Sequence, residues 1–373
     1  MASAISSATG RATPRNSGAT HTFAVVGSAE GPLRDFTRNL IGVLEAAGFE
    51  AAAETAESSV VLNLVDPAEP RPFRRHSKGT FAAALWSLPQ MPADGLRETY
   101  PMLVRALANI GLCLIPGHGV LFTTMEQGYY LVPETDGRLA ERVVERLLPL
   151  ATARLVIDNV FRPDLEPELW QGDELTAELA AVGRRLDRLG LLPAPFPVEE
   201  LVGERDLRHI KRLYGIGGLS YGNLSTRKDS RRFWMSASGV DKSRLSQPGR
   251  DILLVSDYDE TRGRMILSVP PNARPRRVSV DAIEHWMIYR ENPHVGAILH
   301  IHAWLEGITA TEVNYPCGSH ELAQSVAALV AAASRPAEAV VGLRNHGITA
   351  TGPSLTAILD RIEPQLLRRV PMS

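Results

Sequence analysis

The chain has 373 residues, of which 44% are hydrophobic and 22% charged, and its formal net charge is −2. This length favours two domains with buried cores, and the near-neutral charge excludes a global basic field that would recruit nucleic acid or an anionic membrane. The chain has two cysteines, and none of its apolar runs approaches the roughly 20 residues that span a bilayer. These features predict a cytoplasmic protein without disulfides or membrane contact.

Residues 1–20 consist mainly of Ala, Ser, Thr and Gly, with two arginines and no acidic residue. They lack the apolar core of a secretory signal. We therefore expect this segment to be a disordered tail.

From residue 21 onward, segments typical of strands alternate with segments typical of helices. Short apolar runs predict strands at residues 23–26, 60–65, 81–86, 112–115 and 120–122. Apolar positions at helical spacing predict helices at residues 33–44, 96–110, 139–160 and 174–189. This alternation predicts an α/β domain with a mainly parallel sheet over residues 21–195, which ends in the proline-rich connector at 192–197.

Two loops of this first domain contain residues that suit an anion. The turn Gly27–Gly31 could hold a phosphate at a helix N-terminus, but it lacks the G-x-G-x-x-G spacing, and a plain turn is the favoured interpretation. Arg74, Arg75 and Lys78 form a cationic loop, for which a solvated surface loop is the simpler interpretation. The sequence therefore assigns no chemistry to the first domain.

The second domain, residues 196–373, contains the apolar run Gly296–Trp304, in which His300 and His302 are two residues apart. Such a run predicts a buried strand. Alternate side chains of a strand point to the same face, so the two imidazoles should lie about 7 Å apart at their Cα atoms. A hydrogen-bonded core pair and a metal site are the two interpretations of this pattern.

A third histidine favours the metal site. His346 follows the apolar run at residues 339–343, which also indicates a strand. Three imidazole ligands with at least one open position are typical of catalytic rather than structural zinc. We therefore predict that His300, His302 and His346 bind Zn²⁺ or another divalent cation.

The second domain resembles the class II aldolase/adducin family, which includes the fuculose- and rhamnulose-phosphate aldolases and the ribulose-phosphate 4-epimerase. The resemblance covers about residues 200–370, and it implies a three-layered α/β/α domain. The matching segments, in the family's order, are Gly217–Ser225, Trp234–Gly239, Val278–Asp281, His300–His302, Gly318–Leu322 and Arg344–Gly347.

This resemblance implies that three turns hold the phosphate, or another anion, of a small-molecule substrate. It assigns the anion-binding role to Gly222, Asn223, Ser238, Gly239 and Ser279. The second serine of the family's last pair is Val280 here, which removes one donor. Nearby cationic residues could compensate, namely Arg227, Lys228, Arg231 and Arg232.

The resemblance also assigns catalytic residues. Asp281 stands nineteen residues before the first histidine of the pair and occupies the family's acidic position, as a weak metal ligand or a proton-transfer group; Glu284 is its nearby rival. In the aldolases a long segment after the histidine pair carries a catalytic tyrosine, but here only residues 303–314 precede Tyr315. Tyr315 is the expected substitute, with His320 as the alternative.

Together these residues imply a zinc-dependent lyase of the class II aldolase type. It would cleave or form a C–C bond beside a carbonyl, by retro-aldol cleavage or decarboxylation, in a small anionic hydroxy-carbonyl or sugar-phosphate-like substrate through a metal-stabilised enediolate. An epimerase, a dehydratase and a non-catalytic adducin-like interaction module are the alternatives. The resemblance also implies a homo-oligomer, a tetramer, in which a neighbouring subunit or the first domain covers the site with Arg74, Arg75 and Lys78.

Overall fold

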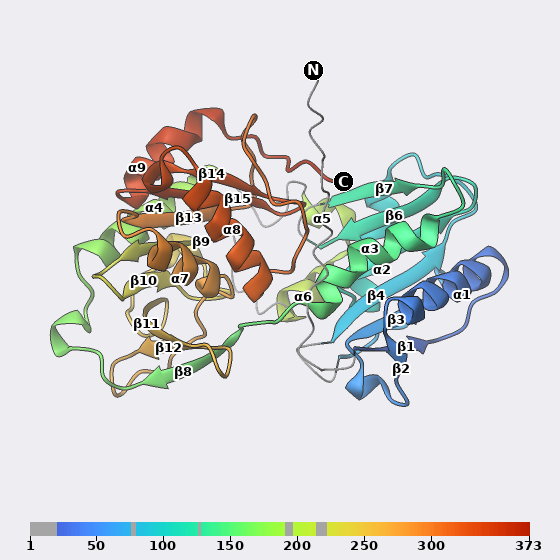
Figure 1. The fold of residues 1–373 in the computed structure, drawn as a ribbon, viewed down its shortest axis with the longest axis horizontal. Helices are drawn as coiled ribbons and strands as arrows, with labels where there is room; N and C mark the ends of the chain where they lie inside the picture. The colour runs from blue at the N-terminus through green and yellow to red at the C-terminus, as the bar shows by residue number, and fades with distance from the viewer. Residues whose placement is uncertain (1–20, 76–79, 126–127, 191–196, 214–221) are drawn as a thin grey trace, which may run out of the picture.

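The computed structural model describes residues 21–75, 80–125, 128–190, 197–213 and 222–373, and shows two α/β lobes, each built around one sheet (Figure 1). The expected tail at residues 1–20 and Lys78 of the cationic loop lie outside these residues. No helix in the described part of the chain is long and apolar enough to cross a bilayer.

The sheet of the N-terminal lobe has seven strands in the order β2-β1-β3-β4-β5-β6-β7. All neighbours up to β5 are parallel, and β6 and β7 are added antiparallel at one edge, which confirms the predicted mainly parallel sheet. The strands are β1 (Thr22–Val26), β2 (Glu50–Ala51), β3 (Val60–Leu64), β4 (Phe81–Ser87), β5 (Ile110–Ile115), β6 (Gly119–Thr124) and β7 (Gly128–Pro133).

Helices cover both faces of this sheet. On one face, α1 (Gly31–Ala46) packs on α3 (Leu139–Thr152). On the other face, α2 (Gly95–Ala106) packs on α5 (Val198–Leu201) and α6 (Glu204–Leu213).

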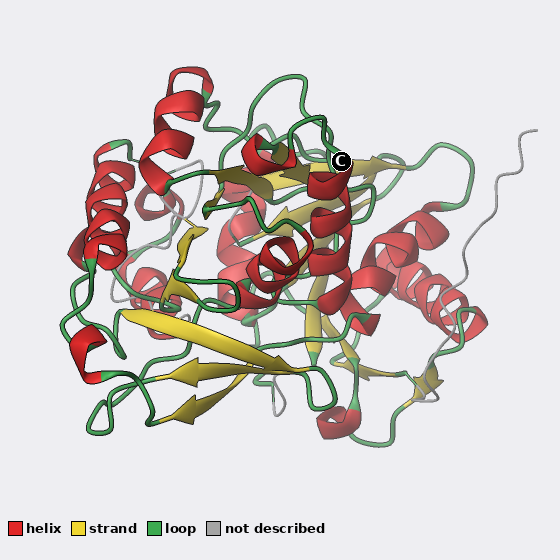
Figure 2. Cartoon of the chain, turned by 60° about the vertical axis from the view of Figure 1, so that its left-hand side comes forward, coloured by secondary structure: helices red, strands yellow, loops and turns green. Residues whose placement is uncertain are grey.

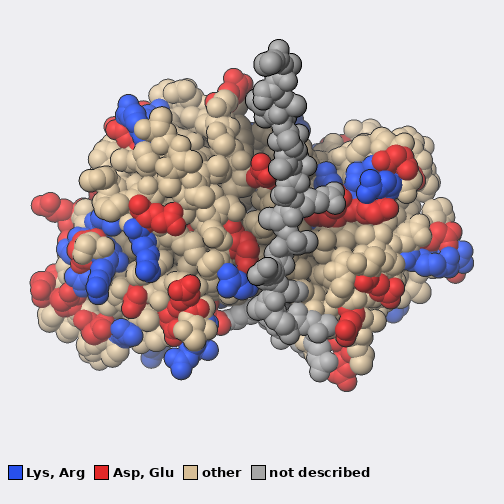
Figure 3. All heavy atoms as spheres, viewed as in Figure 1, with Lys and Arg blue, Asp and Glu red and all other residues tan. Residues whose placement is uncertain are grey.

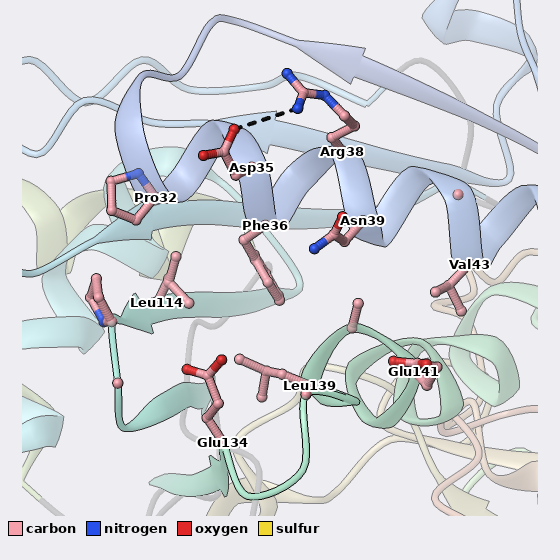
Figure 4. A pocket seen from close by; sticks show the side chains of 15 residues that line it. Pro32, Asp35, Phe36, Arg38, Asn39, Val43, Leu114, Glu134, Leu139 and Glu141 are labelled. Atoms are coloured by element: carbon pink, nitrogen blue, oxygen red, sulfur yellow. Dashed lines mark ion pairs between the residues drawn. The ribbon is translucent and has the colours of Figure 1, made fainter.

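A cavity of about 630 Å³ opens between α1 and α3. Figure 4 shows Phe36 of α1 and Leu139 of α3 among its lining residues, with the ion pair of Asp35 and Arg38 on α1. The lining includes three carboxylates and one guanidinium, namely Asp35, Glu134, Glu141 and Arg38. This balance disfavours an anionic ligand in the cavity.

Two helices of this lobe are shorter than the sequence predicted. The helix expected at residues 96–110 ends at Ala106, because Leu107 adopts a left-handed backbone with φ 55° and β5 begins at residue 110. The helix expected at residues 139–160 ends at Thr152. Beyond Thr152 the backbone forms a hydrogen bond with the C-terminal lobe, in which the N–H of Val156 donates to the carbonyl of Gly318 at 2.7 Å.

The sheet of the C-terminal lobe has eight strands in the order β14-β15-β13-β9-β10-β11-β12-β8. All neighbours are antiparallel except β12 and β8. The strands are β8 (Asp158–Arg162), β9 (Gly222–Arg227), β10 (Phe233–Ser236), β11 (Ile252–Asp259), β12 (Arg264–Ser268), β13 (Ala297–Ile301), β14 (Val340–Leu343) and β15 (Gly347–Gly352).

Two helix pairs flank this sheet and give the implied three-layered arrangement, which Figure 2 shows from the side of this lobe. One pair is α7 (Ala282–Glu291) and α8 (His320–Ala332), and the other is α4 (Glu174–Arg188) and α9 (Leu355–Ile362). Short 3₁₀ turns are η1 (Thr55–Glu57), η2 (Pro167–Leu169), η3 (Lys242–Arg244), η4 (Pro336–Glu338) and η5 (Glu363–Gln365).

The two lobes do not divide the chain at the predicted boundary near residue 195. Strand β8 pairs with β12, and the apolar face of α4, with Leu179 and Leu186, is buried in the core of the C-terminal lobe. Conversely, α6 packs on the N-terminal lobe, where Asp206 accepts a hydrogen bond from Arg105 at 2.9 Å. The segments before the proline-rich connector, β8 and α4, therefore belong to the C-terminal lobe, and α6 after it packs on the N-terminal lobe. In each case the apolar face of the helix matches the core on which it packs.

Candidate metal centre

Strand β13 and the residue that directly follows it place two histidines on one face of the sheet. His300 and His302 are on alternate positions, and the neighbours of His300 in register are Asn223 on β9 and Thr349 on β15. Directly opposed residues of antiparallel strands share a face, so Asn223, His300 and Thr349 form one polar row across three strands. Gly222 begins β9 with φ 105°, and a Cβ there would lie 1.9 Å from the carbonyl oxygen of His300, so only glycine permits this pairing.

The third histidine reaches this face from the turn between β14 and β15. Asn345 adopts a left-handed backbone with φ 57°, which bends the chain. The side chain of the next residue, His346, thereby reaches His300 and His302. The last residue of the chain fixes this turn, because Asn345 donates to the carbonyl of Ser373 and accepts from its N–H, each at 2.9 Å. Met372, next to it, packs on the core of the N-terminal lobe.

The three imidazoles form a compact cluster, and their ligand atoms lie within 4.8 Å of one another. Their ring centroids are 4.7 to 5.3 Å apart, and the Nε2 atoms of His302 and His346 are separated by 3.2 Å. His300, His302 and His346 are only 1%, 9% and 7% exposed. The structure therefore brings together all three predicted ligands, consistent with a divalent-metal site.

The hydrogen bonds of His300 define which nitrogen can bind a metal. Its Nδ1 lies 3.1 Å from the carbonyl of Ile348, which can only accept, so Nδ1 carries the proton. Its Nε2 is buried, has no hydrogen-bond partner among the described residues, and presents a lone pair. Burial lowers the pKa of His300 well below its usual value and that of His346 to about 3, which keeps both rings neutral, as metal ligation requires.

Cys317 is a neighbour of the cluster that sequence reasoning did not identify. Its Sγ lies 3.3 Å from Nε2 of His346, and the following residue, Gly318, contributes a backbone N–H to the site. The only sequence signal was the tripeptide Cys317-Gly318-Ser319, which the resemblance covered only from Gly318 onward.

Asp281 lies beside the cluster and is 5% exposed. Its Oδ2 accepts from Nδ2 of Asn223 at 2.7 Å, and its Oδ1 accepts from the N–H of Gly318 at 3.2 Å. The other side-chain atom of Asn223, Oδ1, is buried without a hydrogen-bond partner among the described residues. Two of the predicted site residues, Asn223 and Asp281, are thus in direct contact and are held by polar groups.

The contact between Asn223 and Asp281 is the first of several along β9 and α7. A strand advances about 6.6 Å every two residues and a helix about 6 Å every four, so the two elements stay in register. Oγ of Ser225 on β9 accordingly lies 2.7 Å from Nδ1 of His285 and 2.9 Å from the hydroxyl oxygen of Tyr289, both on α7. Burial lowers the pKa of His285 to about 3, so the imidazole between Asp281 and Tyr289 is uncharged at neutral pH.

Glu284, the rival of Asp281, faces a different strand. Its Oε1 accepts from the hydroxyl of Thr349 at 2.6 Å, and that hydroxyl is 3.4 Å from Nδ1 of His300. Burial, together with the charge of Asp281, raises the pKa of Glu284 to about 8. At neutral pH it is therefore a neutral carboxyl group behind the first ligand, while Asp281 borders the site.

Lys242 is a second residue that the sequence did not reveal. It is 1% exposed, and its charge interacts with those of Asp281 and Asp241. Burial lowers its pKa to about 8, and the two aspartates oppose that shift. A buried ammonium group therefore offsets the negative charge of Asp281. No spacing in the sequence linked η3 to a carboxylate so far along the chain.

We expect Lys242→Met to lower kcat/KM by about tenfold to a hundredfold without loss of metal, because loss of a partner of a buried charge costs about 1.5–3 kcal/mol. Lys228→Met is the matched control. Nζ of Lys228 lies 2.8 Å from Oδ2 of Asp173, and neither residue has a described contact with the histidines. Steady-state kinetics and metal analysis of the two variants make the comparison. Equal effects of the two substitutions on kcat/KM would show that Lys242 has no specific part in the activity.

The other predicted anion-binding residues lie on two adjacent segments. Ala237 and Val278 form an isolated antiparallel bridge, so Ser238 and Gly239 lie on one segment and Ser279 lies on the neighbouring one, where its N–H donates to the carbonyl of Ser236 at 3.3 Å. The backbone N–H of Ser238 donates to the carbonyl of Arg277 at 2.9 Å. Gly239 also lines a cavity of about 300 Å³ with three arginines, namely Arg244, Arg250 and Arg276.

Several expected residues have no described contact with the cluster. Tyr315 is half-buried. Its pKa is raised mainly by burial and to a smaller extent by the negative charge of Glu321. His320 lies 2.8 Å from a guanidinium nitrogen of Arg154. Arg75 donates to Asn109 within the N-terminal lobe at 3.2 Å.

The C-terminal lobe is thus an α/β/α domain with a buried histidine triad, a candidate metal site, on its sheet. Residues 208–364 match the model of the family described as Class II Aldolase and Adducin N-terminal domain. This match confirms the resemblance that the motifs of this segment predicted. The family match leaves the N-terminal lobe unassigned.

Curated relatives match a shorter segment. Methylthioribulose-1-phosphate dehydratase of Stenotrophomonas maltophilia (strain K279a) is 33% identical over 88 residues, which are 24% of this chain and 36% of that protein. The protein of the same name from Leptospira biflexa serovar Patoc is 33% identical over 103 residues, 27% of this chain and 45% of that protein. The chain thus spans between about a third and a half of the length of these relatives.

Solved structures also align with the chain. L-fuculose-1-phosphate aldolase from Thermus thermophilus aligns with a TM-score of 0.33 and 21% identity, covering 51% of this chain and 90% of that one. L-fuculose 1-phosphate aldolase from Glaciozyma antarctica aligns with a TM-score of 0.30 and 16% identity, covering 50% and 68%.

Proposed function

We propose that the C-terminal lobe is a divalent-metal-dependent lyase that acts on a small anionic hydroxy-carbonyl compound, with dehydration as its first candidate reaction. The observation that supports this most strongly is the cluster of three buried imidazoles beside Asp281. An interaction module would not need a buried, polar and partly unsatisfied cluster, which costs stability unless a ligand compensates.

The ligand set suits zinc. Zinc accepts three imidazoles, and a neutral ligand set leaves the ion its full positive charge. A divalent cation held by His300, His302 and His346 would supply Lewis acidity, which stabilises the negative charge that develops on a substrate carbonyl when the adjacent carbon loses a proton.

The chain's own residues would orient the substrate and move the proton. Asp281 is fixed through both carboxylate oxygens, by Asn223 and by Gly318, so its position is well defined for proton transfer. Asn223, whose Oδ1 is buried without a hydrogen-bond partner among the described residues, and Ser279 are candidates for contacts to substrate hydroxyl or phosphate groups.

Two reactions develop this negative charge on the carbonyl oxygen. In dehydration the adjacent carbon loses a proton, and in carbon–carbon cleavage it loses its bond to the departing carbon fragment. Loss of a hydroxyl group as water is favoured by the similarity to proteins named methylthioribulose-1-phosphate dehydratase. Carbon–carbon cleavage, by retro-aldol reaction or decarboxylation, is the second candidate and has the support of the sequence resemblance. The short segment at residues 303–314, and a Tyr315 without a described bond to the triad, weigh against it.

The test is an assay of the zinc-loaded chain with methylthioribulose 1-phosphate, ribulose 1-phosphate and L-fuculose 1-phosphate, with products identified by mass spectrometry. We expect loss of one water from a ketose 1-phosphate, and no product with His302→Ala. Dihydroxyacetone phosphate would select carbon–carbon cleavage, and no product from any substrate would overturn the proposal. The homo-oligomer implied by the resemblance remains a prediction, which light scattering can test.

A further inference from the structure

A second concave site lies at the opposite end of β9 and α7 from the histidines. Its volume is about 830 Å³, and it is formed by the ends of β9, β10 and β11 and the C-terminal half of α7. Asn223 and Arg227 lie at the two ends of β9, four residues or about 13 Å apart at the rise of a strand. This cavity is therefore separate from the candidate metal centre.

The cavity is strongly cationic. Four arginines line it, namely Arg227, Arg231, Arg232 and Arg290, against a single carboxylate, that of Asp257. Figure 3 shows Lys and Arg side chains gathered on the side of the C-terminal lobe that faces away from the N-terminal lobe. The excess of positive charge in a concave site favours an anionic ligand.

Two of these arginines are already engaged. Arg227 donates to the carbonyl groups of Val295, Tyr289 and Asn292 at 2.6 to 2.9 Å and stacks on the ring of Tyr289 at 4.5 Å. Arg232 pairs with Asp229 at 2.7 Å and with Glu166 at 2.5 Å. Partners within the protein therefore hold these two lining side chains in place.

The other two arginines remain available for a ligand. Arg231 and Arg290 are exposed, and within the described ranges neither forms an ion pair. Arg231 follows β9 in the turn to β10, and Arg290 is in the last turn of α7, so they approach the cavity from two elements. Guanidinium groups bind phosphate in bidentate geometry, which makes a phosphorylated ligand the best match.

Aromatic side chains form the rest of the wall. Phe233 and Tyr289 are buried, while Trp286 is half-buried and also lines the cavity. An indole ring beside arginines can stack on a planar base while the guanidinium groups bind phosphate. The sequence suggested that the cationic residues at 227–232 compensate for the missing serine of the phosphate turn. The structure places them at the other end of β9, where Arg227, Arg231 and Arg232 line this cavity and Lys228 pairs with Asp173.

We propose that this arginine-lined cavity binds a phosphorylated ligand with an aromatic base, of the nucleoside diphosphate class. Arg231 and Arg290 contact the phosphates, and Trp286 contacts the base. The proposal does not depend on the proposed lyase activity, because it rests on different residues and its test measures binding.

Calorimetric titration of the full chain with ADP and with pyrophosphate, without added metal, tests the proposal. The double variant Arg231→Gln/Arg290→Gln should weaken binding of both probes by at least about tenfold, and Trp286→Leu should weaken ADP by about tenfold but leave pyrophosphate unchanged. Arg262→Gln/Arg274→Gln is the control, since it removes the same charge from exposed positions of the same lobe outside the cavity. It should change either affinity by less than about twofold.

Asn223→Ala separates this cavity from the candidate substrate site, and it should leave ADP binding unchanged. Three results would overturn the proposal. These are no saturable binding of either probe to the wild-type chain, equal losses in the two double arginine variants, and loss of ADP binding in Asn223→Ala.

Discussion

His302→Ala should lower kcat/KM by about a thousandfold or more, because Lewis-acid stabilisation of a developing oxyanion contributes several kcal/mol and each factor of ten corresponds to about 1.4 kcal/mol. His302 directly follows β13, and its Nε2 is 3.2 Å from that of His346. Two imidazoles would remain, which bind a divalent ion more weakly. Steady-state kinetics with zinc-supplemented protein measure the loss.

His294→Ala is the matched control for this substitution, since His294 is exposed and lies outside the cluster. It should leave kcat/KM unchanged. The thermal midpoint should fall only for His302→Ala, because bound metal stabilises the folded state by mass action. If the two variants had equal activity, the cluster would have no catalytic part.

Asp281→Asn should lower kcat/KM by about a hundredfold to ten-thousandfold while the protein retains its metal, since this is the usual contribution of a positioned proton-transfer group. The amide is nearly isosteric and can still accept from the N–H of Gly318, but it cannot take up a proton at neutral pH. Metal content and kinetics, measured on the same preparation, separate loss of chemistry from loss of the ion.

Glu284→Gln provides the comparison for Asp281→Asn. Glutamine mimics the neutral carboxyl, so turnover at neutral pH should change little. The folded pKa of Glu284 is about 8 against an ordinary value of 4.5, so the folded state binds more protons between these values. Stability should therefore fall as pH rises through this window, and Glu284→Gln should lack that decline. A large loss of turnover in Glu284→Gln, with none in Asp281→Asn, would reverse the assignment.

The sequence was most informative about β13. Its run of apolar residues and the period of two side chains predicted that His300 and His302 share a buried face, and the structure confirms it. The family motifs located Asn223 and Asp281, whose contact follows from the matching repeats of β9 and α7. In these cases a local repeat determines which side chains meet.

Contacts between distant segments were not predictable in the same way. His346 is oriented by the left-handed Asn345 and by hydrogen bonds to Ser373, and Lys242 and Cys317 reach the site from separate loops. The boundary near residue 195 failed for a similar reason. The apolar faces of α4 and α6 show that each helix packs on a core, but not which of the two cores it joins.

Elemental analysis of the purified chain and of the three single variants His300→Ala, His302→Ala and His346→Ala tests the metal centre most directly. The buried triad predicts one divalent ion, most readily zinc, per wild-type chain, and loss of most of it in each variant but not in His294→Ala. A wild-type chain without a divalent ion after purification in the presence of zinc, or unchanged metal content in His302→Ala, would contradict the account.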